Sequence, residues 1–249
     1  MIRLLPGLLL LPLAACNATP DTSTLLVVGS DLDNPPFAWV DEEGVARGRD
    51  VEMMQLLAER IDRVLLWERM PFDELLDACE AGRVDAVCAT LGITEERARR
   101  VLFSEPSFET AISVVSRSGA GEPTGIDDLA DLRVSAGTGT TSQLAVERLL
   151  PRARGVFENK SGLPTAERLL RREVDAAVMD GPAARRLVQE SGGELRLLVA
   201  ELAAERYALC LPKDHESLTR DLDRALGELR AEGALDALDQ RFELASGAR

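Results

Sequence analysis

Residues 84–100 read VDAVCATLGITEERARR, and this stretch decides how the rest of the chain is interpreted. The apolar run that ends at Thr90 and Gly92 predicts a short buried strand. Thr94 suits the N-cap of the charged helix that follows, because its hydroxyl can accept a hydrogen bond from a backbone N–H of the first turn. Ligands of open α/β sheets bind at the carboxyl ends of strands, so we expect a binding site here.

Arg97 lies in the first turn of this predicted helix, where a cation opposes the helix dipole. A nearby anion would offset the unfavourable interaction of the Arg97 charge with the helix dipole. The Thr90 hydroxyl, the backbone N–H of Gly92 and the Arg97 guanidinium together suit a carboxylate. The alternative is that Arg97 shares a solvated helix face with Arg99 and Arg100.

A second copy of the pattern lies further along the chain. Residues 163–180, LPTAERLLRREVDAAVMD, repeat residues 73–90, DELLDACEAGRVDAVCAT, and the alignment places Asp180 where Thr90 stands. If each copy organises one lobe, the cleft between the lobes has an anion-binding wall and a cation-binding wall, as a zwitterion requires. The alternative is that Asp180 is a turn or cap residue, because a Gly-Pro pair follows it.

The turn GTGTT, residues 137–141, precedes another predicted helix. Its N–H groups, including those of Thr138, Thr140 and Thr141, can bind an anion. A plain strand-to-helix turn explains the same residues.

The amino-acid composition argues against several classes of function. The 249 residues are 45% hydrophobic and 29% charged, which is enough for two modest lobes with real cores. The formal net charge of −14, without a long basic run, argues against a nucleic-acid partner. With one histidine and no CxxC motif, we expect no metal, cofactor or histidine-based nucleophile.

The amino terminus has the layout of a bacterial lipoprotein leader. Residues 1–15 form a short apolar segment broken by proline and glycine, and Leu13-Ala14-Ala15-Cys16 is similar to a lipobox. We expect cleavage before Cys16, lipidation of that cysteine and a polar tether over 16–24. The protein would be exported and held at a bacterial membrane by the lipid alone. A cleavable secretory signal with a chance cysteine is the alternative.

Three cysteines remain in the mature chain. Cys88 and Cys210 lie in apolar strand patterns, as inert core thiols do. In an oxidising compartment a disulfide between Cys79 and Cys88 is also compatible with the sequence.

Strand and helix patterns alternate along the chain, which predicts a mostly parallel α/β sheet in each lobe. The segment 111–117 is a candidate crossing between lobes, and 207–212 is a strand that returns to the first lobe. The expected strands are 25–31, 64–70, 84–90, 132–137, 155–160, 174–180, 195–200 and 207–212.

Taken together, these motifs resemble the family-3 bacterial extracellular solute-binding proteins, the polar amino-acid receptors of ABC importers. The resemblance implies a type II periplasmic-binding-protein-like fold, a two-lobed clam with two hinge crossovers. It divides the chain into a first lobe (25–112 and 207–249) and a second lobe (113–206). The segments that carry it are VGSDLDNPPF (28–37), GRDVEM (48–53), PFDELLDACEAGRVDAV (71–87), GITEERARRVLFSEP (92–106), GTT (139–141), VDAAVMD (174–180) and LGELRAEGALDALDQRF (226–242).

The resemblance also implies roles for individual residues. Arg97 would bind the ligand α-carboxylate with the Thr90 and Gly92 region and the Thr141 N–H. Asp180 would bind the α-ammonium, assisted by the Thr90 hydroxyl or the Ala89 carbonyl.

The side-chain end of the pocket departs from the family. Asp31 would lie there, but the family usually has aromatic residues where this chain has Asn34 and Arg49. An Arg49 that points inward favours an acidic ligand, whereas an Arg49 paired with Asp31 favours a small neutral one.

The expected function is a non-catalytic, monomeric receptor that captures an amino acid or related small carboxylate and presents it to an ABC permease. Two alternatives stay open: an enzyme resembling the periplasmic cyclohexadienyl dehydratases, and a sensor or orphan receptor without a transporter.

Overall fold

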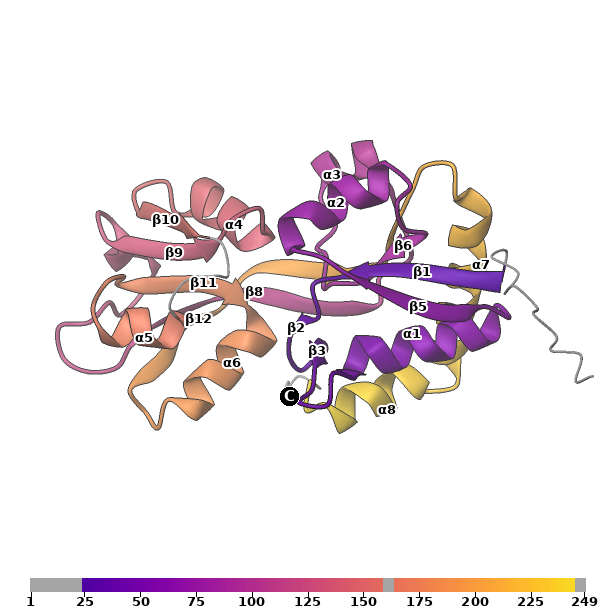
Figure 1. The fold of residues 1–249 in the computed structure, drawn as a ribbon. Coiled ribbons are helices and arrows are strands. Elements are labelled where there is room, and N and C mark those ends of the chain that lie inside the picture. The colour runs from indigo at the N-terminus through magenta and orange to yellow at the C-terminus, as the bar shows by residue number, and fades with distance from the viewer. Residues whose placement is uncertain (1–23, 159–163, 245–249) are drawn as a thin grey trace, which may run out of the picture.

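The computed structural model describes residues 24–158 and 164–244. The proposed leader, Cys16 and almost all of the tether lie outside the described residues. Within these two ranges no helix is long and apolar enough to cross a membrane. The chain folds into two α/β lobes joined by a pair of long strands (Figure 1).

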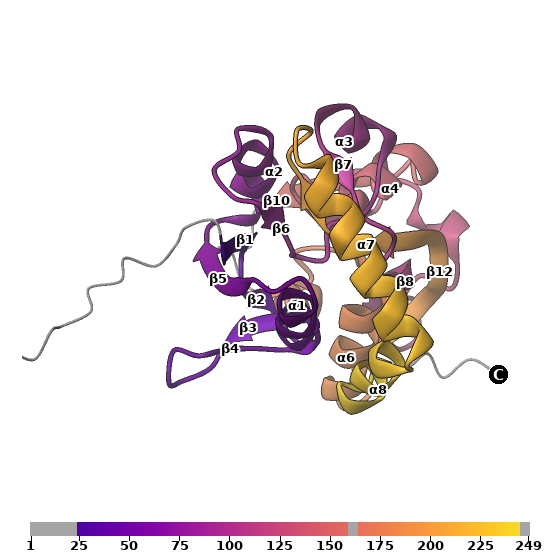
Figure 2. The ribbon, with the colours of Figure 1, turned by 90° about the vertical axis from the view of Figure 1, so that its right-hand side faces the viewer.

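The first lobe is built on a five-stranded sheet with helices on both faces. Apolar residues of α1 (Arg49–Arg60), which include Met53, Met54 and Leu57, pack on one face together with α7 and α8, and α2 covers the other face. Figure 2 shows α1 and α2 on opposite sides of this sheet. The sheet order is β5 (Val64–Arg69), β1 (Leu25–Ser30), β6 (Ala86–Val87), β13 (Cys210–Leu211) and β7 (Leu102–Phe103). The remaining elements are β2 (Asp33–Asn34), β3 (Ala38–Val40), β4 (Ala46–Arg47), α2 (Phe72–Glu80), α3 (Glu95–Arg100), α7 (Glu216–Ala231) and α8 (Ala234–Arg241).

The second lobe repeats the plan. Its five-stranded sheet has α4 on one face and α5 with α6 on the other. The sheet order is β10 (Arg154–Glu158), β9 (Arg133–Gly137), β11 (Ala176–Asp180), β8 (Phe108–Arg117) and β12 (Leu195–Tyr207). Its helices are a 3-10 turn (Ile126–Leu129), α4 (Thr141–Leu149), α5 (Thr165–Leu170) and α6 (Gly181–Glu190). The two copies of the sequence repeat supply the middle strand of each sheet, β6 and β11.

Both sheets are mixed. In each, three neighbouring strands are parallel and two further strands pair antiparallel. The chain enters the second lobe along β8 and leaves it along β12, and these strands pair antiparallel from Phe108 with Tyr207 to Arg117 with Leu195. The strand predicted over 195–200 is therefore longer than expected, because β12 continues to Tyr207, whereas the strand predicted over 207–212 to return to the first lobe is confirmed as β13. The polar run 201–206 has no strand period, but pairing with β8 keeps it extended.

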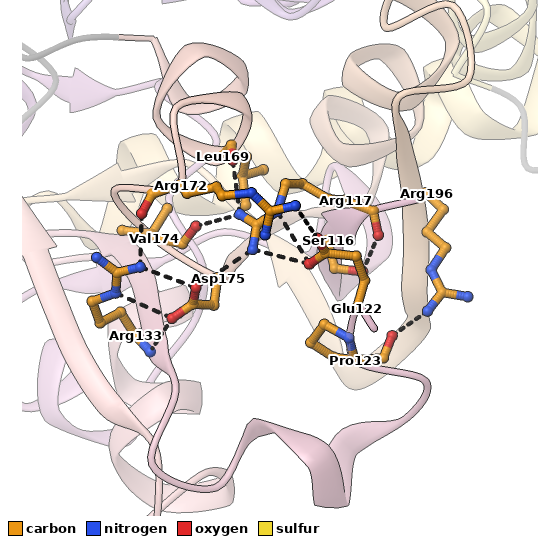
Figure 3. A network of polar contacts seen from close by, with 10 residues as sticks. All are labelled: Ser116, Arg117, Glu122, Pro123, Arg133, Leu169, Arg172, Val174, Asp175 and Arg196. Carbon is orange, nitrogen blue, oxygen red and sulfur yellow. Dashed lines mark hydrogen bonds and ion pairs between the residues drawn. The ribbon is translucent and has the colours of Figure 1, made fainter. Parts of the chain in front are cut away.

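A buried ion network braces the second lobe (Figure 3). Arg117, at the end of β8, donates from Nη1 to the carbonyls of Leu169 and Val174, at 2.7 Å each. Its guanidinium also pairs with Glu122 at 3.0 Å and with Asp175 at 3.4 Å. Three of these four partners, Leu169, Val174 and Asp175, connect β8 with the α5–β11 unit.

Candidate functional site

A cavity of about 550 Å³ lies between the two lobes. The carboxyl ends of strands from both sheets open into it, as expected for ligand sites of α/β sheets. The described residues that line it include Asn34, Thr90, Gly92 and Arg97 of the first lobe and Thr140, Thr141 and Asp180 of the second.

Arg97 is buried at the base of α3, and only 9% of it is exposed. Thr94 caps this helix, because its hydroxyl accepts a hydrogen bond from the Arg97 N–H at 3.2 Å. The guanidinium donates to the carbonyl of Gly92 at 2.6 Å and to the carbonyl of Gly139, across the cleft, at 2.9 Å. The solvated-face interpretation of Arg97 is therefore wrong, whereas Arg99 is exposed.

The anion-binding wall continues in the second lobe. Helix α4 begins at Thr141, and Thr140 caps it by accepting a hydrogen bond from the Gln143 N–H at 3.2 Å. Thr140 also donates to the Gly137 carbonyl at 2.7 Å, which holds the turn. The first N–H groups of α4 have no partners within the helix, so they offer donors to an anion in the cavity.

Asp180 also lines the cavity, at the end of β11. It has the N-cap position of α6, but its side chain makes no capping hydrogen bond within this helix. Asp180 is thus the N-cap residue of α6 by its backbone position, but its carboxylate does not cap the helix. Near Thr90, the Asn34 side chain donates to the Thr90 hydroxyl at 2.9 Å, which fixes the first-lobe wall.

Sequence reasoning missed two residues of this region. Phe72, at the start of α2, lines the cavity and gives it an aromatic wall. Glu205, on β12, lies behind the anion-binding wall with 5% exposure, and its Oε1 accepts a hydrogen bond from the Thr141 hydroxyl. Nothing in the run LAAERY marks Glu205, because its role depends on where a crossing strand passes.

Burial and the nearby Asp180 carboxylate raise the pKa of Glu205 to about 8, from an ordinary value of 4.5. The Thr141 hydrogen bond and the Arg97 charge oppose this rise. Burial lowers the pKa of Arg97, and the Glu205 and Asp180 carboxylates oppose that fall. The four side chains therefore form one electrostatic unit.

The model of the bacterial extracellular solute-binding proteins, family 3, matches residues 26–245, nearly all of the chain. The chain belongs to this family. The probable amino-acid-binding protein YxeM of Bacillus subtilis is 27% identical over 243 residues, which cover 94% of this chain and 91% of the relative. The L-cystine-binding protein TcyJ of Escherichia coli K12 is 28% identical over 229 residues, which cover 91% of this chain and 85% of the relative.

Among solved structures, the amino acid ABC transporter substrate-binding protein AbpA of Streptococcus pneumoniae, bound to L-arginine, superposes with a TM-score of 0.80. It is 25% identical, and the match covers 92% of this chain and 98% of AbpA. The two-lobed fold of this solute-binding protein is thus the fold of its relatives.

Four predicted site residues of this solute-binding protein are not among the described residues that line the cavity: Asp31, Arg49, Ala89 and Thr138. Ala89 and Asp31 are buried behind the wall, and Thr138 is exposed.

Arg49 differs from both sequence-based alternatives. It is fully buried, and its guanidinium pairs with Asp50 at 3.0 Å and with Asp239 of α8 at 2.8 Å. It also donates to the Ser107 carbonyl at 2.7 Å and lies over the Phe108 ring. The Arg49 side chain thus points to these buried partners, and Arg49 is not among the residues that line the cleft.

The described residues contain no group of three or more His, Cys, Asp or Glu side chains that could hold a metal ion.

Proposed function

We propose that this solute-binding protein captures a free amino acid between its lobes. Arg97 and the first turn of α4 bind the α-carboxylate, and Asp180 binds the α-ammonium group. The Thr90 hydroxyl, held by Asn34, adds a hydrogen bond. One observation carries the proposal: a buried guanidinium and a helix N-terminus share a single cavity with a carboxylate at a strand end.

The rest of the lining favours a polar ligand side chain. Arg168 lines the cavity and pairs with Glu158, another lining residue, at 2.9 Å. Phe72 supplies one apolar surface. Arg49 forms its ion pairs inside the first lobe, away from the cleft. Its positive charge is therefore not available to bind an acidic side chain of the ligand. The ligands named for the relatives, L-cystine and L-arginine, are polar amino acids.

We also propose how the protein is anchored, how its lobes close and to which partner it delivers the ligand. It acts as a monomer, tethered by lipid on Cys16, and presents its ligand to the permease of an ABC importer. The lobes, with proposed bounds of 25–112 with 207–249 and 113–206, close by bending of β8 and β12. Replacing Cys16 with Ser should release the protein from membranes in a fractionation experiment, and retention of the variant in the membrane would contradict the anchor.

A thermal-shift panel of the common amino acids tests the ligand site, with Arg97→Ala as the site variant and Arg99→Ala as the matched control from the exposed face of α3. A ligand at about a thousand times its dissociation constant stabilises by ~4 kcal/mol. We expect one polar amino acid to raise the Tm of the wild type and of Arg99→Ala, and not of Arg97→Ala. An equal shift in both variants would contradict the assigned wall.

The proposal contains no catalytic step. The residues after Asp180 are Gly181, Pro182, Ala183 and Ala184, so this strand end adds no acid or base beyond Asp180. Prephenate belongs in the same panel, and its conversion by the protein would favour a dehydratase.

A further inference from the structure

Cys79 of α2 and Cys210 of β13 meet in the core of the first lobe. Both are fully buried thiols, and their Sγ atoms lie 3.1 Å apart. Non-bonded carbon atoms prefer ~3.5–4.0 Å, and sulfur is larger than carbon. The two sulfurs are therefore much closer than packing alone requires, and about 1 Å of further approach gives the length of a disulfide bond.

Cys88 is not positioned to form a disulfide with Cys79 or Cys210. Cys79 and Cys210 belong to the apolar cluster under α2, together with Val87. Cys88 belongs to the cluster on the other face of the sheet, because adjacent residues of an extended segment point to opposite faces. It contacts Asp50 there. The Cys79–Cys88 pairing that the sequence left open is thus not the one this fold favours.

We propose that Cys79 and Cys210 form a disulfide in the exported protein. The family is extracellular, and disulfides persist in such compartments. In the reaction, a small-molecule or protein disulfide oxidises both thiols. The S–S bond of the oxidant breaks and the Cys79–Cys210 bond forms. The oxidant leaves as two thiols, which carry the two protons that the cysteines lose. Burial and each other's proximity raise the pKa of the Cys210 thiol, so exchange takes place before the lobe is packed.

The position of the bond gives it a specific effect. Both cysteines lie in the first lobe, on segments that precede and follow the whole second lobe in the chain. The disulfide therefore ties the two halves of the first lobe together without crossing the cleft. It stabilises that lobe against unfolding and leaves bending of β8 and β12 free.

The test uses the full chain exported into an oxidising cell envelope, with Cys16→Ala so that three cysteines remain. Thiols are alkylated in denaturant before and after reduction, and peptides are mapped by mass spectrometry. We expect only Cys88 to be labelled before reduction and all three cysteines after it. Reduction should also lower the Tm of this protein by several degrees. Cys88→Ser is the matched control: it should show no labelled thiol before reduction, two after it and the same fall in Tm. Cys210→Ser should show both remaining thiols labelled without reduction and no fall in Tm.

Two outcomes overturn the inference: labelling of three thiols without reduction, or a cross-linked peptide that joins Cys79 to Cys88. Neither readout requires a ligand, so the result does not depend on the outcome of the thermal-shift panel of amino acids.

Discussion

Glu205 shows how a single buried carboxyl group can tune the anion-binding wall. It lies against Thr141 of the second lobe and Gly92 of the first, with Arg97 and Asp180 nearby. An ionised Glu205 would cancel the charge that Arg97 offers to a ligand carboxylate. Because the pKa of Glu205 is about 8, the group is mostly protonated at neutral pH, and the guanidinium keeps its attraction for an anion.

Replacement of Glu205 with Gln tests this state through pH. The pKa of Glu205 is raised on folding, from 4.5 to about 8, so its protonation stabilises the fold fully below pH 4.5, and this contribution is lost as the pH rises through 8. Relative to Glu205→Gln, the wild type should therefore lose roughly 4 kcal/mol of unfolding free energy between pH 5 and 9. Urea unfolding of both proteins across this range measures the difference. A constant difference would show that Glu205 is not protonated in the fold.

The sequence predicted those site residues that stand at strand ends and helix starts, because such positions follow from local patterns. Arg97, Thr90 and Asp180 all line the cavity. Arg49 and Glu205 could not be placed, because their surroundings come from distant parts of the chain. Arg49 meets Asp239, 190 residues away, and Glu205 meets Thr141, 64 residues away.

Among the secondary-structure elements, the α5–β11 unit is joined to β8 by strand pairing and by one buried guanidinium. Arg117 satisfies two carbonyls at the ends of this unit and compensates Glu122, which is 9% exposed. Loss of Arg117 leaves the two buried carbonyls without this donor and leaves the buried Glu122 with Arg172 as its remaining ion-pair partner, at 2.8 Å.

We therefore expect Arg117→Ala to lower the unfolding free energy by ~3–5 kcal/mol. The double variant Arg117→Leu with Glu122→Leu should recover part of the loss, because no charge then remains buried alone. Arg148→Ala, on the exposed face of α4, is the control. Denaturant titration of the four proteins measures this, and equal stability of Arg117→Ala and Arg148→Ala would mean that the network contributes nothing.

Most elements could be predicted from periodicity and turn residues. The expected strands near 25–31, 64–70 and 132–137 are confirmed as β1, β5 and β9. β12 could not be predicted in full, because backbone pairing with β8 imposes the strand conformation where side chains do not. The segments that became β8 and β13 were predicted as extended, but their antiparallel pairing could not be predicted, because it depends on distant parts of the chain.

In the whole molecule, the lobes meet across the cleft at a position that admits no side chain. A Cβ atom on Gly92 would lie 2.6 Å from Glu205 Oε1 and 2.7 Å from Thr141 Cγ2. The hydrogen bond from Arg97 to Gly139 spans the same gap. A side chain at this position would therefore force Glu205 or Thr141 to shift when the lobes are in contact.

Gly92→Ala should hold the lobes slightly apart. A clash worth ~1–3 kcal/mol weakens ligand binding by ~5- to 150-fold. Because the clash exists only when the lobes are closed, the stability of the ligand-free protein should change less. Gly227→Ala, where an added Cβ meets nothing within 4 Å, is the matched control. Calorimetric titration with the ligand found in the panel gives both affinities, and equal values would show that Gly92 is not a closure contact.

The pairing of Arg117 with Leu195 has an evolutionary consequence. The segment 118–194 starts and finishes at neighbouring positions of one ladder, so one continuous stretch of the gene encodes everything between these two ends. A recombination event with breakpoints in β8 and β12 would exchange the half of the pocket that carries Thr141 and Asp180 and leave the half with Arg97 and Thr90 in place. Ligand specificity in such a protein can change by shuffling one gene segment, without stepwise substitution of the whole cleft.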